Sequence, residues 1–112
     1  MKSQLKIANG QGFWGDSVDA PYKLIKNADI DYITLDYLAE VTLSIMQRQK
    51  LKNPNAGYAR DFLNLVGRIL PEIADKGVKV ITNAGGVNPQ SCRSELIQLA
   101  SSSGKEIKIG VI

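Results

Sequence analysis

Short segments rich in β-branched and aromatic residues alternate with longer segments of helical periodicity along this 112-residue chain. The strand-like segments are residues 5–8, 31–36, 78–82 and 107–112. Strands that are joined through helices need crossover connections, and such connections produce a parallel sheet. We therefore predict an α/β fold, a parallel sheet of about four strands with covering helices.

Capping and breaking residues divide the helical segments, which we expect at residues 17–27, 38–49, 59–76 and 89–103. Asp16 or Ser17 can cap the first helix. Pro71 is expected to kink or restart the third helix, because proline removes a backbone donor. Asn88 is a typical N-cap followed by proline at the first helical position, so it marks the start of the fourth helix.

The chain shows no internal repeat, linker or low-complexity segment, and its length suits one domain. The last strand-like segment is not followed by a loop. We therefore expect residues 1–112 to be a single, truncated domain, a fragment of a larger α/β domain.

Composition excludes several classes of site. There is one cysteine, Cys92, and no histidine, so this chain alone can form neither a disulfide nor a Ser-His-Asp triad. A buried small side chain is the preferred interpretation of Cys92, although a position in the first turn of a helix can lower a thiol pKa. The net charge of +3 comes from scattered basic residues, so no nucleic-acid partner is expected. No segment approaches the roughly 18 apolar residues of a membrane span, and we expect a cytoplasmic protein.

Glycine, asparagine and acidic residues gather after three of the predicted strands, in residues 9–16, 36–40 and 82–89. The carboxyl ends of parallel strands are where α/β folds place their ligands, and the following helix N-termini favour anionic groups. We predict that the three loops converge and bind a small anionic ligand, with no metal assigned and the cofactor left open. The candidate ligand-binding residues are Gly10, Gly12, Gly15, Asp16, Asn83, Gly85, Gly86 and Asn88.

Asp36 and Glu40 are the candidate catalytic residues. Their carboxylates can exchange protons with a substrate or hold a hard cation such as Mg²⁺. The alternative is that Asp36 only caps the next helix and Glu40 only favours its positive end. Asn88 has a similar structural explanation as a cap, and the glycines at 85 and 86 either admit a ligand or simply make the turn.

Residues 10–15 match the pattern G-x-G-x-x-G after a strand, and Asp36 ends the second strand. Together they resemble a dinucleotide-binding fingerprint. In that motif the helix starts near the second glycine, which would place Pro21 inside it, and Phe13 and Trp14 are large for a turn that contacts a pyrophosphate. A Rossmann-like domain therefore stays an alternative, as does a tight turn without a ligand, and a different anion-binding loop is preferred.

Several segments, taken in order, resemble the N-terminal part of the acyclic terpene utilisation (AtuA-like) family. They are residues 12–16, 29–32, 36–42, 54–62 and 77–89. The most specific combination is Asp-Tyr-Leu-Ala-Glu at 36–40 with Thr-Asn-Ala-Gly-Gly at 82–86. This resemblance extends over nearly the whole chain.

The resemblance implies a longer bacterial-type catabolic protein that takes part in breaking down acyclic terpenoids, whose acids are processed as coenzyme A thioesters. It names a pathway rather than a reaction. We expect part of an enzyme that binds an anionic molecule such as a CoA thioester, and a homo-oligomer in the full-length protein. The rival hypothesis is a non-catalytic binding or assembly domain.

Overall fold

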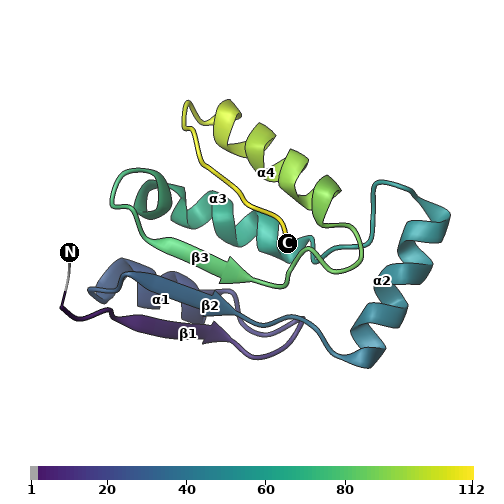
Figure 1. The fold of residues 1–112 in the computed structure, drawn as a ribbon, viewed down its shortest axis with the longest axis horizontal. Coiled ribbons are helices and arrows are strands. Elements are labelled where there is room, and N and C mark those ends of the chain that lie inside the picture. Colours follow the sequence, from purple (N-terminus) through teal and green to yellow (C-terminus); the bar gives the residue numbers. More distant parts are fainter. Residues whose placement is uncertain (1–2) are drawn as a thin grey trace.

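The computed structural model describes residues 3–112 and has three strands and four helices within that range (Figure 1). In chain order they are β1 (Ile7–Gln11), α1 (Asp19–Asn27), β2 (Tyr32–Leu35), α2 (Glu40–Lys52), α3 (Asp61–Ala74), β3 (Lys79–Thr82) and α4 (Pro89–Ser102). Strands and helices alternate as the sequence pattern predicts, so the α/β class is confirmed. No helix of the described residues is long and apolar enough to cross a membrane.

The sheet has the strand order β1-β2-β3, and both pairs of neighbours are parallel. Ile33 of β2 lies between Ala8 of β1 and Val80 of β3. The register shifts between Asn9 and Gln11, where β1 carries a bulge-like irregularity. Because all three strands run the same way, their carboxyl ends meet at one edge of the sheet.

The core lies on one face of the sheet, under α1 and α3. Helix α1 packs on β1 and on α3, and α4 packs on α3 (Figure 1). Fully buried side chains from β2 and α3 meet there, among them Ile33, Leu65 and Ile69. On the other face, Ile7 and Ile81 are 63% and 57% exposed. The described residues therefore cover only one side of the sheet.

The prediction of a fourth strand at residues 107–112 is wrong for the described structure, since no strand is assigned there. Ile107 and Ile109 are half-buried against the core, and alternate residues of this segment are more and less exposed, as in a strand. The Ile109 carbonyl, however, accepts a hydrogen bond from Arg93 Nε of α4 at 3.2 Å. The apolar pattern requires a half-buried surface, and packing on α4 supplies one without a strand partner.

Three local expectations also change. Strand β1 starts and ends later than residues 5–8, so Gly10 lies inside the strand. Helix α3 runs from Asp61 to Ala74 with Pro71 inside it, so the helix does not restart there. Helix α1 begins at Asp19, and Ser17 Oγ accepts a hydrogen bond from the Asp19 amide at 3.2 Å, although Val18 occupies the N-cap position. The predicted start of α4 is confirmed, with Asn88 as the N-cap and Pro89 in the first turn.

Candidate functional site

Hydrogen bonds tie the carboxyl ends of the three strands together. The Asp36 amide, just after β2, donates to the Gln11 carbonyl at the end of β1 at 3.1 Å. Asn83, just after β3, donates from Nδ2 to Asp36 Oδ1 at 2.8 Å. Its Oδ1 accepts from the Tyr37 amide at 2.7 Å. The predicted meeting of the three loop starts at one edge is therefore observed. This edge, from Gln11 through Asp36 to Asn83, is called the rim below.

Asp36 is the best oriented carboxylate of the rim. Its Oδ1 also accepts from the Leu38 amide at 3.3 Å. Its Oδ2 receives no hydrogen bond from residues 3–112, and the side chain is exposed. One oxygen is thus held in place while the other faces solvent.

Glu40 is the first residue of α2 and is also exposed. Its side chain makes no hydrogen bond or ion pair with residues 3–112. The Thr42 hydroxyl accepts from the Ala39 amide at 2.6 Å and donates to the Ala39 carbonyl at 2.7 Å, but no side chain of the described residues accepts from the amides of residues 40–42. The first amides of α2 therefore point to solvent beside the rim, where they can attract negative charge. Asp36 does not cap this helix, which leaves its side chain available for another role.

Asp16 organises the loop between β1 and α1. Its Oδ2 accepts from the Gly12 amide at 3.1 Å, and its Oδ1 accepts from the Ser17 amide at 2.8 Å. Gly15 has φ of +96°, a conformation that favours glycine. Both Asp16 and Gly15 therefore have structural roles. An added Cβ would meet no atom within 4 Å at Gly12 or at Gly15, so packing requires glycine at neither position.

The geometry of this loop differs from a dinucleotide fingerprint. Gly10 lies within β1, and a Cβ there would come within 2.8 Å of both Leu35 and Pro21. Helix α1 does not start near Gly12 but at Asp19, and Pro21 occupies its first turn. Gly10 is thus a packing residue, and no helix N-terminus stands at the second glycine.

Most candidate ligand-binding residues after β3 also have structural roles. Asn88 is buried; it caps α4 and donates to the carbonyls of Pro54 and Ala56 at 2.9 and 2.8 Å. A Cβ on Gly85 would contact Pro89 at 2.8 Å, and one on Gly86 would strike Met46. The Gly86 amide donates to the Asn83 carbonyl at 3.1 Å, so it is not a free donor for a ligand. Of this group only Asn83 joins the rim through its side chain.

A buried polar cluster behind the rim was missed from the sequence. Tyr37 is fully buried, and burial followed by the charge of Asp61 raises its pKa well above the usual value. The nearby Gln11 side chain lowers this pKa and so opposes part of the rise. Neither the Tyr37 hydroxyl nor Gln11 Oε1 makes a hydrogen bond to any described residue. Trp14 Nε1 donates to Asp61 Oδ1 at 3.1 Å. The one sequence signal was a tyrosine next to a candidate catalytic aspartate.

Cys92 lies in the core at 4% exposure, and burial raises its pKa to about 11. The interpretation of Cys92 as a buried small side chain is therefore confirmed. Among residues 3–112, no three carboxylate or thiol side chains are grouped so that they could hold a metal ion.

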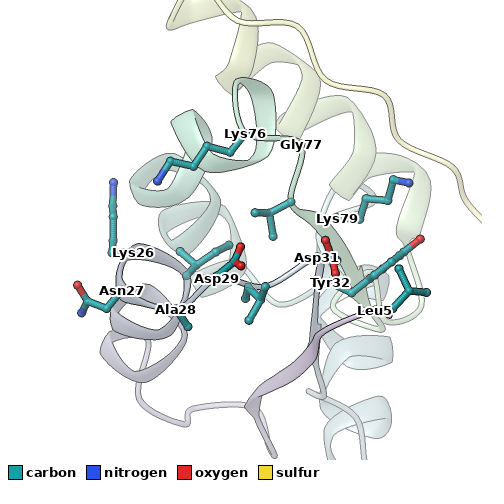
Figure 2. A pocket seen from close by; sticks show the side chains of 13 residues that line it. Leu5, Lys26, Asn27, Ala28, Asp29, Asp31, Tyr32, Lys76, Gly77 and Lys79 are labelled. Carbon is teal, nitrogen blue, oxygen red and sulfur yellow. The ribbon is translucent and has the colours of Figure 1, made fainter. Parts of the chain in front are cut away.

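A pocket of about 570 Å³ opens at the opposite end of the sheet, beside the amino ends of β2 and β3 (Figure 2). Its lining includes Lys26, Asp29 and Lys79. Each of these already has a partner: Lys26 pairs with Glu72 at 2.6 Å, Asp29 pairs with Lys6 at 3.1 Å, and Lys79 lies over the Tyr32 ring. We assign no function to this pocket, since these three charged side chains already have partners within the chain.

Comparison with known protein families adds to this geometry. The family model described as acyclic terpene utilisation family protein AtuA matches residues 5–112. This chain belongs to that family. The match includes the whole rim and every strand and helix, as the Asp-Tyr-Leu-Ala-Glu and Thr-Asn-Ala-Gly-Gly segments predicted. No match was found among curated proteins, and none among solved structures.

Proposed function

We propose that this AtuA family chain is part of a catabolic enzyme for acyclic terpenoids, and that the rim holds the reacting end of the substrate. The observation that carries the proposal is the hydrogen bond from Asn83 to Asp36. It fixes an exposed carboxylate where three parallel strands end, which is the usual position of catalytic groups in α/β folds.

Asp36 is the proposed general base and Glu40 the second acid/base candidate. A general base must lie within hydrogen-bonding reach of the proton that it removes, and the Oδ2 of Asp36 is open to a substrate. Asn83 is a positioning residue, because both ends of its amide are engaged by Asp36 and Tyr37. Because Glu40 lies four residues after Asp36, in the first turn of α2, the two carboxylates border the same loop.

The proposed substrate class is an acyclic terpenoid acid carried as a CoA thioester. The carboxylates of the rim would repel the phosphates of such a molecule, so we place the thioester carbonyl at Asp36 and the phosphates farther away. Phe13, which is 60% exposed in the loop after β1, offers an apolar surface to the terpenoid chain. Such thioesters are intermediates of the cytoplasm, and we propose that location for the protein.

The test compares Asp36→Asn with Asp29→Asn. Asp29 is an exposed carboxylate at the opposite end of the sheet, so its change is the matched control. Calorimetry with an acyclic terpenoid CoA thioester, free CoA and the free acid measures binding, and mass spectrometry follows conversion of the thioester. We expect Asp36→Asn to keep binding and to lower conversion by about 10²–10⁴-fold, the contribution of general base catalysis. Asp29→Asn should leave both unchanged.

Two results would overturn the proposal. If the wild-type chain binds none of the three molecules, the rim is not a site for this substrate class. If it binds the thioester without converting it, and Asp36→Asn is without effect, the non-catalytic binding or assembly role is correct instead.

A further inference from the structure

Helix α2 stands at one end of the molecule, apart from the sheet (Figure 1). Within this helix only Met46 is buried. Three of its apolar side chains, Val41, Ile45 and Leu51, are 70%, 40% and 77% exposed. Single exposed apolar residues are ordinary, but three on one short helix mark a surface for association.

These apolar residues lie on the side of α2 that faces away from the body. With 3.6 residues per turn, Val41 and Ile45 fall on nearly the same line along the helix, and Met46 falls on the opposite side. Lys50 also faces the body, where its Nζ donates to the Val87 carbonyl at 3.1 Å. The outward line from Val41 and Ile45 continues through Arg48 and Lys52, which we call the outer face of α2.

Charge on this helix is divided between its two ends. Glu40 is the single acidic residue and stands at the first position, whereas Lys52 stands at the last position and Arg48 lies just past the middle of the helix. None of the three forms an ion pair with residues 3–112. The N-terminal end of the outer face is therefore negative and the C-terminal end positive, so the face is complementary to an antiparallel copy of itself.

We propose that two copies of this chain associate through the outer faces of α2, antiparallel about a two-fold axis at the level of residue 46. Glu40 then lies opposite Lys52 of the partner subunit, and Val41 lies opposite Leu51 of the partner subunit. The helix dipoles run in opposite directions, which also favours the pair. A two-fold axis repeats every contact, so each attraction occurs twice.

The size of the surface sets the strength of the dimer. A helix of 13 residues is about 20 Å long, and such a pair buries less than the roughly 800 Å² per partner of a standard interface. We therefore expect a reversible dimer with Kd on the order of 10–100 μM.

The open face of the sheet is less suited to a second copy. It carries Ile7 on β1 and Ile81 on β3, but Tyr32 and Thr34 of β2 lie between these strands, and Lys79 stands beside Ile81 on β3 with its ammonium over the Tyr32 ring. The two exposed isoleucines are therefore separated by a half-buried strand and do not form one contiguous apolar surface.

Dimerisation through α2 would also change the charge at the rim, and this consequence rests on the proposed function. It brings Lys52 of the partner subunit beside Glu40, next to the loop that carries Asp36. The rim then gains the positive charge that its own carboxylates lack for an anionic ligand.

Sedimentation equilibrium over a concentration series tests the dimer without any ligand. We expect Ile45→Asp to be monomeric throughout, and Glu40→Lys and Lys52→Glu each to weaken association about tenfold through like-charge contacts. The double variant Glu40→Lys/Lys52→Glu should restore it, because the two charges exchange places. Ile81→Asp is the matched control on the sheet face and should leave the dimer intact. Circular dichroism confirms that each variant is folded.

The proposal is wrong if the wild type is monomeric up to about 1 mM, at which even a weak contact would be populated. It is also wrong if Ile81→Asp, rather than Ile45→Asp, abolishes the dimer, or if the double charge exchange gives no recovery. Ligand binding is measured separately by calorimetry. A dimer that binds no thioester contradicts the proposed function alone, and a monomer that binds it contradicts the dimer alone.

Discussion

Asn83 holds Asp36 and the backbone of Tyr37 at the same time, through Nδ2 and Oδ1 of one amide group at 2.8 and 2.7 Å. This single side chain connects the end of β3 to the turn after β2. The candidate base is thus positioned by a neighbouring strand, and its orientation depends on the sheet being assembled.

Replacing Asn83 with alanine should lower both stability and function. The variant leaves the partly buried Tyr37 amide without its acceptor, so we expect a loss of about 1–2 kcal/mol in the free energy of unfolding. Urea denaturation measures that loss, and thioester conversion should fall further than stability explains. Asn88→Ala is the control, because Asn88 is structural and should reduce stability without changing conversion by the folded protein. An Asn83→Ala chain as stable and active as wild type would contradict the role of this amide.

The glycines at 10 and 12 should respond oppositely to alanine. A Cβ on Gly10 would come within 2.8 Å of Leu35 and Pro21, so overpacking should destabilise by about 1–3 kcal/mol. A Cβ on Gly12 meets no atom within 4 Å, and we expect a change within about 0.5 kcal/mol. Thermal unfolding of the two variants is the measurement. Equal effects at both positions would show that the loop, and not the core contact, determines the outcome.

Removing only one partner of the Lys26–Glu72 ion pair should destabilise the protein more than removing both partners. Glu72 is 4% exposed, its Oε2 lacks a hydrogen bond among the described residues, and Lys26 Nζ lies 2.6 Å from Oε1. Lys26→Met should cost about 1–3 kcal/mol, reduced from a fully buried case because the lysine is 31% exposed. The double variant Lys26→Met/Glu72→Leu should recover most of that loss in chemical denaturation. If the double variant is less stable than Lys26→Met, the loss in that single variant does not come from leaving the buried Glu72 carboxylate without its partner.

Cys92 should react slowly with iodoacetamide in the native protein at pH 8 and quickly in denaturant. Burial raises its pKa to about 11, so the native thiol stays protonated at that pH and is also shielded. The protonated thiol stabilises the folded state fully below the ordinary thiol pKa of 9.0, and this contribution is lost as pH rises through about 11. A comparison of wild type with Cys92→Ala between these pH values isolates that loss. Rapid native alkylation would mean that the site opens readily.

NAD and NADP should bind poorly despite the G-x-G-x-x-G match. Core side chains fill the space next to Gly10, so a ligand cannot approach there. Helix α1 begins at Asp19, well beyond the second glycine. The pyrophosphate would therefore lack the helix N-terminus that the motif normally provides. Calorimetric titration is the check, and micromolar affinity for either dinucleotide would return Asp36 to the position of a ribose ligand.

The fold was predictable where the residue pattern is local and strong. The capped start of α4 follows from Asn88 and Pro89, and the parallel sheet follows from strands separated by helices. The segment at 107–112 was misjudged because its apolar alternation suits any half-buried surface, including the side of α4. Pro71 is expected to kink or restart α3, but the helix does not restart there, and the buried packing of Leu65 and Ile69 favours a continuous helix.

The sequence predicts which loops meet at the site. It does not predict which of their side chains are already engaged in packing or hydrogen bonds within the fold. Asp36 and Asn83 were both chosen from their places after strands, and they are in contact. The sequence does not distinguish Gly10, Gly86 and Asn88, which have packing partners, from Gly12, which has none. That distinction depends on long-range contacts, such as Gly86 with Met46, which no pattern along the chain reveals.

Asp36 and Tyr37 are adjacent in the chain yet belong to different environments, one in solvent and one wholly in the core. The Tyr37 ring meets Phe62 of α3 edge-on, with centroids 5.9 Å apart. A change of volume at Phe62 would therefore move the anchor of the turn that presents Asp36. The orientation of whatever side chain occupies position 36 therefore depends on the aromatic pair beneath it. Substitutions in the core at Phe62 and substitutions at the surface at position 36 are not independent in this protein.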